Sequence, residues 1–392
     1  MLTIVTPEEA GFASERLRDL DEAMQAYVGP GKVAGLSTLV VRRGQVVHRR
    51  CYGQINLALG SPVQSNSIFR VASLTKPITA VAALMLHDEG RFGLHDPVSR
   101  WIPELTDLKV YKGTLDTRYE FVELERELTF WHLLTHTAGF AYGVEPDDPV
   151  ADLYREAGFF SPIFALQVSL PEMIRRLVQL PLVGQPGEAF HYSISYDVLG
   201  YLIELISGKP FDVYLREHIF EPLGMIDTGF WVPESKRDRF GPLYSAPGES
   251  GIFSLDEPAA GPYGRPGTVP SGGGGLASTL PDYFRFLSML LNGGELDGIR
   301  LLEPSTVKQM LTNQVKGGVR PGQGYGFGVG LQVEDQRPGG LPQGVFGWGG
   351  GAGTGAWVYP AAGLITAIMY QAFAYSEPAN RFRALTFAAL LQ

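Results

Sequence analysis

The 392-residue sequence contains a single cysteine, Cys51, so the chain cannot form a disulfide with itself. It also has no run of about 18 apolar residues, the length that a membrane-spanning helix needs. Its first residues include neither the basic segment nor the apolar segment of a secretory signal. We therefore expect a cytoplasmic protein that does not enter a membrane.

The charge balance is acidic. Lys and Arg number 32 against 41 Asp and Glu, which gives a net charge of −9, and no long basic block occurs. Nucleic acids and anionic membrane surfaces attract clusters of positive charge, so neither is an expected partner. Apolar residues make up 45% of the chain, which is enough for a large folded core and argues against disorder.

Three known catalytic and binding patterns are missing. There is no Gly-x-Ser-x-Gly, the nucleophile turn of α/β-hydrolases. His132 and His136 are four residues apart, but no Glu follows His132 as it would in a zinc protease helix. The glycines at 272–275 are not followed by the Lys-Ser/Thr of a phosphate loop. The sequence therefore predicts no metal site, no nucleotide and no other cofactor.

The sequence does contain Ser73-x-x-Lys76, at the start of a long apolar helix expected over residues 73–89. Residues three apart lie on the same face of a helix, which would bring the Lys76 amine beside the Ser73 hydroxyl. A serine needs a nearby base to become a nucleophile, and a lysine withdrawn from water can release its proton and act as that base. The pair is a candidate catalytic centre for acyl transfer, although so short a motif also arises by chance.

A second candidate follows the turn at Pro186-Gly187. Tyr192 lies just before a helix expected from Ser195, and a tyrosine close to a lysine ammonium can carry protons between a nucleophile and a leaving group. Without such a neighbour it would be an ordinary buried tyrosine. Asp197 lies on the same helix, and we assign it to the substrate pocket, with a solvated surface carboxylate as the alternative.

The third candidate is the glycine-rich end of a predicted strand, which reads Phe346-Gly347-Trp348-Gly349-Gly350-Gly351. Glycine allows a ligand to approach the backbone closely, so an N–H at this strand end can donate to a developing oxyanion. The N–H of Ser73, at a helix N-terminus, would be the second donor. The Trp348 indole offers a flat apolar wall, and we expect Trp348, Gly349 and Gly350 to border the substrate.

The order of the expected elements predicts an inserted domain. The chain begins with a helix and a β-hairpin, and it ends with several strands and a helix. Short connections between the late strands favour antiparallel pairing. We predict an α+β fold in which residues 1–75 and 260–392 form one sheet domain. Residues 76–259 would form a mostly helical insertion, with a small hairpin near 104–130.

Together these motifs resemble the serine β-lactamase superfamily, in particular class C β-lactamases and the family VIII carboxylesterases. The matching segments are Ser73-Leu74-Thr75-Lys76, Leu133-Leu134-Thr135-His136-Thr137-Ala138-Gly139, Pro186-Gly187, Tyr192-Ser193, Glu221-Pro222-Leu223-Gly224-Met225, Gly273-Gly274-Gly275-Leu276 and Trp348-Gly349-Gly350. The resemblance extends over residues 7–390. It implies a class C β-lactamase-like fold, with a mixed, mainly antiparallel sheet flanked by helices, and an acyl-enzyme on Ser73.

Two departures distinguish the chain from the lactamases and cell-wall peptidases of this superfamily. Those enzymes usually carry Tyr-x-Asn, whereas Ile194 takes the third position here and cannot hydrogen-bond a β-lactam amide. They also usually carry Lys-Thr-Gly on the late strand, where this chain has Trp348-Gly349-Gly350, as in the family VIII esterases. Exchange of a cation for an aromatic wall is expected to weaken binding of anionic β-lactams and to favour neutral esters.

The resemblance therefore predicts a serine carboxylesterase for small-molecule esters with short or bulky groups. Ser73 would attack the ester carbonyl, and Lys76 and Tyr192 would receive its proton. The N–H groups of Ser73 and Gly351 would stabilise the oxyanion. The residues leave open whether Lys76 or Tyr192 is the base. They also leave open an acyltransferase, a weak β-lactamase or D-amino-acid peptidase, and a binding module without catalysis, and they predict no oligomeric state.

Overall fold

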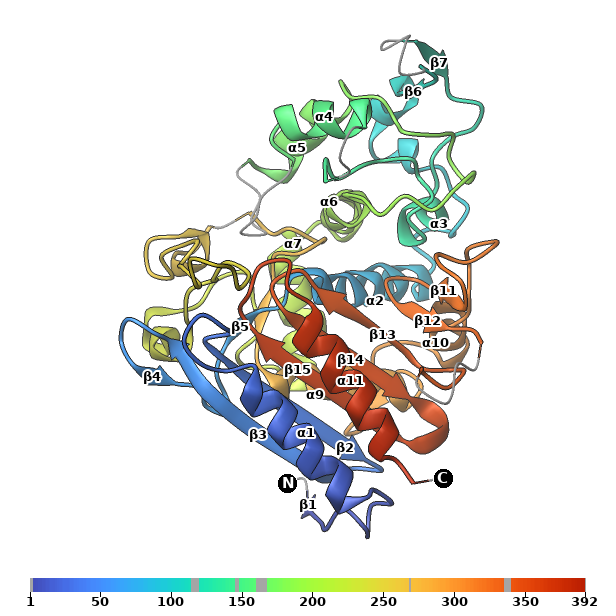
Figure 1. Ribbon diagram of the computed structural model, residues 1–392. Coiled ribbons are helices and arrows are strands. Elements are labelled where there is room, and N and C mark those ends of the chain that lie inside the picture. The colour runs from blue at the N-terminus through green and yellow to red at the C-terminus, as the bar shows by residue number, and fades with distance from the viewer. Residues whose placement is uncertain are drawn as a thin grey trace.

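The computed structural model describes residues 3–113, 120–144, 148–159, 168–267, 269–334 and 340–391. The strands of its main sheet are β1 (Thr3–Ile4), β2 (Gly35–Arg42), β3 (Gln45–Asn56), β4 (Ser61–Pro62), β11 (Gln323–Tyr325), β12 (Gly330–Gln332), β13 (Phe346–Gly350), β14 (Thr354–Tyr359) and β15 (Leu364–Tyr370). Their order is β1-β3-β2-β15-β14-β13-β12-β11, with β4 paired to β3. β1 runs parallel to β3 and the other pairs are antiparallel. Because β2 pairs with β15, segments from both ends of the chain build one sheet (Figure 1).

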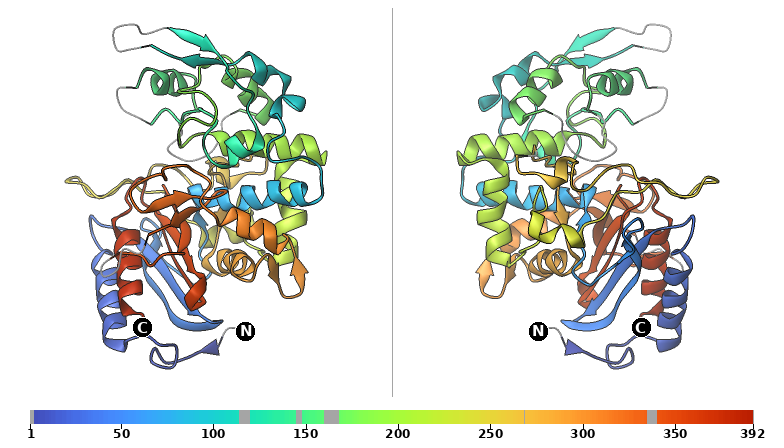
Figure 2. Two further views of the ribbon diagram at one scale, coloured as in Figure 1. Left: turned by 90° about the vertical axis from the view of Figure 1, so that its right-hand side faces the viewer. Right: turned by 90° about the vertical axis from the view of Figure 1, so that its left-hand side faces the viewer.

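Helices cover both faces of this sheet. They include α1 (Ser14–Ala26), α2 (Thr75–Asp88), α9 (Leu280–Leu291) and α11 (Glu377–Ala389). On β15, Leu364 and Ile368 share an apolar cluster with α1 and α11, whereas Ile365 and Met369 share one with α2 and α9. β15 is buried along its whole length and, apart from Thr366, its residues are all among the buried hydrophobic ones, as expected for a strand covered on both faces. Figure 2 shows α1 and α11 on one side of the sheet and α2 and α9 on the other.

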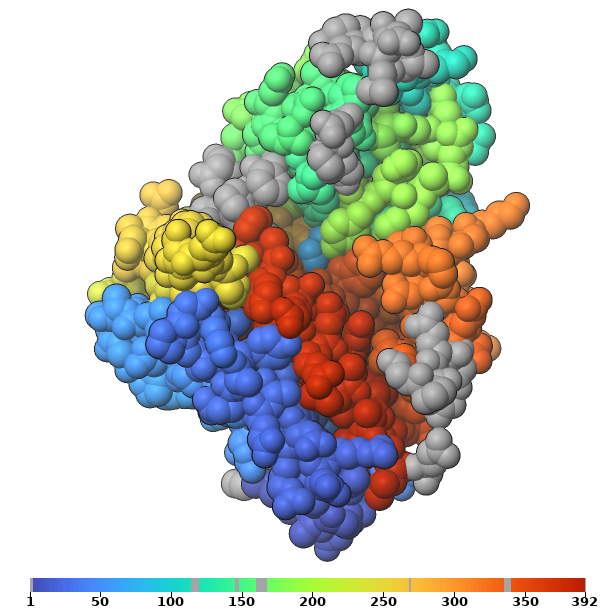
Figure 3. Space-filling view, in the orientation of Figure 1, coloured from blue at the N-terminus to red at the C-terminus, as the bar shows by residue number. Residues whose placement is uncertain are grey.

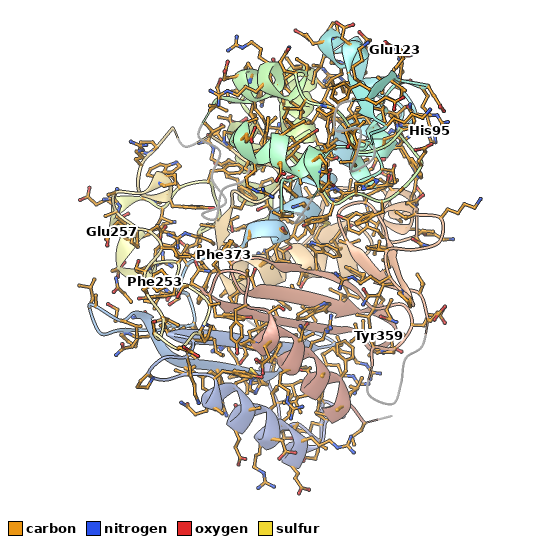
Figure 4. All side chains as sticks on the ribbon, turned by 45° about the horizontal axis from the view of Figure 1, so that its top comes forward. His95, Glu123, Phe253, Glu257, Tyr359 and Phe373 are labelled. Carbon is orange, nitrogen blue, oxygen red and sulfur yellow. The ribbon has the colours of Figure 1, made fainter. Side chains whose placement is uncertain are left out.

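The middle of the chain lies above α2 in the view of Figure 1. Its elements are β6 (Lys109–Tyr111), β7 (Phe121–Glu123), α3 (Phe130–Leu134), α4 (Pro149–Glu156), α5 (Leu170–Leu177) and α6 (Ser195–Ser207). β6 pairs antiparallel with β7 inside the segment where the sequence predicts a hairpin. In Figure 4, His95 and Glu123 lie in this upper part and Tyr359 lies on the sheet. No helix among the described ranges is long and apolar enough to cross a membrane.

The chain then returns towards the sheet. The strands and α-helices not yet named are β5 (Phe69–Arg70), which precedes α2, and then α7 (Phe211–Leu215), α8 (Glu221–Leu223), β8 (Ala277–Ser278), β9 (Glu295–Leu296), β10 (Ile299–Arg300) and α10 (Pro304–Met310). Phe240 forms a β-bridge with Ile68, and Tyr244 forms one with Ala372. These bridges connect the end of the segment 76–259 to residues just before α2 and just after β15. The domain boundaries drawn from the sequence remain a prediction.

The structure differs from the helix predicted over residues 73–89 at its start. Ala72–Leu74 form a 3₁₀ turn, and α2 begins at Thr75. Pro77 fits into the first turn of α2 because its missing N–H would have no helical partner there. Most residues of α2 are buried, as expected for a helix that runs through the core with apolar residues on all sides.

Candidate active site

Ser73 and Lys76 are in contact at the start of α2. Lys76 Nζ lies 3.2 Å from Ser73 Oγ, and only 1% of Lys76 is exposed. The ammonium group also donates to the carbonyl oxygen of Gly273 at 2.6 Å. A proton can therefore pass directly between the serine oxygen and the lysine nitrogen.

The backbone before Ser73 has an unusual conformation. Ala72 has a φ of 46°, in the left-handed region that residues with a Cβ rarely adopt. The carbonyl before Ala72 accepts a hydrogen bond from Thr354 Oγ1 of β14 at 3.0 Å. On the other side, the Leu74 carbonyl accepts one from the Tyr283 hydroxyl of α9 at 2.8 Å. These long-range bonds hold the strained turn in place and so determine where Ser73 points.

Tyr192 lies against Lys76, as the sequence predicts. Lys76 Nζ is 4.6 Å from the centre of the Tyr192 ring. The indole N–H of Trp348 donates to the Tyr192 hydroxyl oxygen at 3.0 Å. Trp348 is therefore more than an apolar wall, because it also determines the position of the tyrosine oxygen. Nothing in the sequence around Trp348 reveals that contact.

His136, which belongs to one of the matching motifs, supports Tyr192. The two ring centres are 4.5 Å apart, His136 is fully buried, and its φ is 55°. The N–H of Ser193 donates to Nδ1 at 3.2 Å, so the ring hydrogen is on Nε2. Burial, and after it the charge of Lys76, holds the pKa of His136 well below its usual range. His136 is thus a neutral packing residue, and the other histidine of the pair, His132, accepts the N–H of Thr129, the N-cap residue of α3.

The structure corrects the position expected for Asp197. This residue is 2% exposed, so it is neither a surface carboxylate nor part of the pocket wall. Its Oδ1 accepts hydrogen bonds from Ser271 Oγ at 2.6 Å and from the N–H of Gly273 at 3.2 Å. Burial raises the pKa of Asp197, while the Ser271 hydrogen bond and the charge of Lys76 act in the opposite direction. Gly273 links the two charges, because its N–H donates to Asp197 and its carbonyl accepts from Lys76.

The glycines at the end of β13 allow that strand to approach Ser73. A Cβ on Gly350 would collide with the backbone of Val71, two residues before the serine. Gly349 and Gly351 line the same pocket as Ser73. Gly350 instead faces an adjoining cavity of about 250 Å³. The structure thus brings Ser73 and Gly351 to one pocket, and the oxyanion role of their N–H groups stays a prediction.

The pocket has a volume of about 550 Å³. Ser73, Tyr192 and Trp348 line it, and so do Asn380 and Arg383 of α11, which the sequence did not single out. Figure 3 shows a hollow in the surface between the green upper part and the red C-terminal segment. Atoms with the blue colour of α2 are visible inside it. The arrangement places a serine hydroxyl, a lysine amine and a tyrosine hydroxyl beside space for a small molecule, which are groups that acyl transfer could use.

Comparisons with known proteins agree with this description. The family model "Beta-lactamase" matches residues 20–390. An uncharacterized protein of Mycobacterium tuberculosis (strain CDC 1551 / Oshkosh) is 34% identical over 361 residues, which cover 87% of this chain and 86% of that protein. Esterase EstB of Burkholderia gladioli is 31% identical over 365 residues, which cover 88% of each chain. Among solved structures, "EstCE1, a hydrolase with promiscuous acyltransferase activity" matches with a TM-score of 0.78 at 24% identity, over 96% of this chain and 98% of its own. The structural match confirms the predicted β-lactamase-like fold.

Proposed function

The chain belongs to the Beta-lactamase family, and on this basis we propose that it is a serine carboxylesterase of the family VIII type, acting through an acyl-enzyme on Ser73. The resemblance to the serine β-lactamase superfamily that the motifs predict is thereby confirmed. The observation that carries the proposal is the contact between buried Lys76 and Ser73, with Tyr192 against the lysine, beside an open pocket.

In the first half of the reaction, Ser73 Oγ forms a bond to the ester carbonyl carbon, and its proton moves to whichever of Lys76 and Tyr192 is deprotonated. The oxyanion that forms is held by the N–H groups of Ser73 and Gly351. Collapse of this intermediate breaks the bond to the alcohol oxygen. The departing alkoxide takes a proton from Tyr192, whose oxygen stays in position through the Trp348 N–H.

In the second half, a water molecule attacks the acyl carbonyl and gives its proton to the same Lys76–Tyr192 pair. The bond to Ser73 Oγ then breaks, the serine recovers its proton, and the carboxylic acid leaves. In each half the pair first accepts a proton and then returns it, so it acts as base and then as acid.

Two observations favour esters over β-lactams as substrates. Ile194 takes the position where lactamases carry an amide, and its hydrocarbon side chain, which is 1% exposed, gives a β-lactam amide no hydrogen-bond partner. The relative from Burkholderia gladioli is named an esterase. Short-chain or bulky esters are the substrate class that we propose, in keeping with a pocket of about 550 Å³.

The first test measures hydrolysis of p-nitrophenyl butyrate and of nitrocefin by the purified protein, with Ser73→Ala as the control. We expect ester cleavage that depends on Ser73, little nitrocefin turnover, and loss of about 10⁴-fold or more in the variant. A fluorophosphonate should label the wild type and leave Ser73→Ala unlabelled. Nitrocefin turnover faster than ester cleavage would contradict the esterase, and absence of labelling would indicate a binding module without catalysis.

An acyltransferase is the second candidate, because the open pocket leaves room for an alcohol in place of the hydrolytic water. A structure with the same fold is titled a hydrolase with promiscuous acyltransferase activity. Addition of a primary alcohol to the ester assay separates the two. Transfer product that exceeds hydrolysis at millimolar alcohol would favour the transferase, and free acid as the main product would favour the esterase.

A further inference from the structure

A second cavity lies between the main sheet and α9, on the face of the sheet that carries this helix (Figure 2). Its volume is about 520 Å³, close to the volume of about 550 Å³ at Ser73. None of the residues that the structure describes lines both spaces. The proposed ester hydrolysis does not use this second cavity, which has the size of a small-molecule site.

The walls of the cavity are apolar. Side chains from the sheet and from α9 face each other across it, among them Leu39, Val41, Ile365, Leu280, Phe284 and Leu291. The three that come from the sheet are at most 4% exposed, so this wall belongs to the core. Apolar side chains that border an unfilled space lose the dispersion contacts of close packing. The cavity therefore favours an apolar group that fills it.

The charged residues around the cavity leave one positive charge without a partner. Arg285 pairs with Asp297 at 2.6 Å, and it also donates to the Leu223 carbonyl oxygen. Arg49 lines the cavity and is exposed, and it forms no ion pair with a carboxylate of the described ranges. Arg49 of β3 lies directly opposite Leu39 of β2, so the two side chains leave the sheet on the same face. A cation next to an apolar wall favours a ligand that combines an anionic group with an apolar chain.

Ser37 places a hydroxyl group near this cation. It lies two residues before Leu39 on β2, so its side chain points to the same face, and it also lines the cavity. Its hydroxyl donates to the Arg50 carbonyl oxygen at 3.4 Å, which is long for a hydrogen bond between these groups. A carboxylate beside Arg49 would be a better acceptor for this hydroxyl.

We propose that this cavity is a binding site for an amphipathic carboxylate with a single alkyl chain, as in a fatty acid. The alkyl chain fills the space between β2 and α9, and the carboxylate accepts hydrogen bonds from the Arg49 guanidinium and the Ser37 hydroxyl. The site lies apart from Ser73, so the inference goes beyond the proposed esterase and does not depend on it.

The test compares ligands that share one alkyl chain and differ in the charge of the head group. Isothermal titration calorimetry with octanoate, 1-octanol and octylammonium measures a dissociation constant for each. We expect octanoate to bind most tightly and octylammonium most weakly. Arg49→Gln should weaken octanoate binding about 3- to 5-fold, the range expected for an exposed ion pair, and should leave octanol binding unchanged.

Two further variants locate the site. Arg50→Gln is the matched control, because Arg50 follows Arg49 on β3 and points to the opposite face, with its Nε 3.7 Å from an Asp21 oxygen. This variant should leave octanoate binding unchanged. Ser288→Phe places a ring inside the cavity and should abolish binding of both octanoate and octanol. The Ser288 hydroxyl donates to the Phe284 carbonyl oxygen, so the hydrogen bond that is lost lies within α9.

The Ser73 pocket is the other place where octanoate can bind, and Trp348→Ala distinguishes the two because Trp348 lines that pocket. Octanoate binding that persists in Trp348→Ala and is lost in Ser288→Phe would support the proposal. If Ser288→Phe does not fold, the comparison of Arg49→Gln with Arg50→Gln decides.

Three results would overturn the proposal. They are octanoate binding that is absent or no tighter than octanol binding, equal effects of Arg49→Gln and Arg50→Gln, and loss of octanoate binding in Trp348→Ala. None of these measurements requires turnover, so the carboxylate site and the esterase can each fail without the other.

Discussion

Replacement of Asp197 by Asn tests how a buried carboxylate holds Lys76 in place. The Asp197 carboxylate accepts the Ser271 hydroxyl and the Gly273 N–H, and the Gly273 carbonyl accepts the Lys76 ammonium. The Asn variant keeps the shape of the side chain and removes its charge. The Ala variant also removes the acceptor, so the Gly273 peptide would lose the group that orients it.

The expected losses of stability and of kcat follow from these contacts. Exchange of two charge-assisted hydrogen bonds for neutral ones costs about 2 kcal/mol, and release from burying the charge offsets part of that. We therefore expect Asp197→Asn to lower the free energy of unfolding by about 1 kcal/mol. Asp197→Ala leaves two buried donors without an acceptor and should cost about 2–5 kcal/mol. Displacement of Lys76 from Ser73 should reduce kcat about 10-fold in the Asn variant and about 100-fold in the Ala variant, with little change in KM.

The assay combines urea unfolding with steady-state hydrolysis of p-nitrophenyl butyrate, under conditions in which each variant remains folded. Ser271→Ala is the matched control, because it removes one donor to the carboxylate and leaves the Gly273–Lys76 contact complete. It should lose stability and retain most of its kcat. If Asp197→Ala had the kcat of the wild type, the argument that Asp197 acts through Lys76 would be refuted. A lower kcat/KM that came only from a higher KM would refute it as well.

Three other predictions concern the tyrosine contact, the buried Asp282 and the half-buried His132. Trp348→Phe removes the N–H donated to Tyr192, and kcat for p-nitrophenyl butyrate should fall about 10-fold; an unchanged kcat would contradict the contact's role. Burial raises the pKa of Asp282 to about 6, so the folded state keeps a proton that the unfolded chain releases near pH 4. The contribution of Asp282 to the free energy of unfolding should therefore fall by about 3 kcal/mol as the pH rises from about 4 to about 6, and this fall should appear as the difference between urea titrations of the wild type and of Asp282→Asn. Burial lowers the pKa of His132 to about 4, so unfolding takes up a proton below about pH 6.5. The contribution of His132 to the free energy of unfolding should fall by up to about 3 kcal/mol as the pH drops from about 6.5 to about 4, and this fall should appear as the difference between the wild type and His132→Gln measured in the same way.

The strands show which parts of the fold can be predicted from sequence. The late strands and the final helix follow from short-range patterns, and short connections between strands favour antiparallel neighbours. The turn at Ala72 could not be predicted, because a left-handed φ at an alanine persists only when distant groups hold it. For that reason the helix predicted from Ser73 begins as a 3₁₀ turn.

The sequence by itself predicts that Ser73 meets Lys76, because side chains three residues apart lie on one face both in an α-helix and in a 3₁₀ turn. Only the tertiary structure decided which groups surround that pair. The Gly273 carbonyl is 197 residues from Lys76, and the Trp348 N–H is 156 residues from Tyr192. Asp197 became a buried acceptor and Arg383 became part of the pocket through the packing of α6 and α11. Such contacts depend on how distant segments fill a shared volume, which no local pattern of residues encodes.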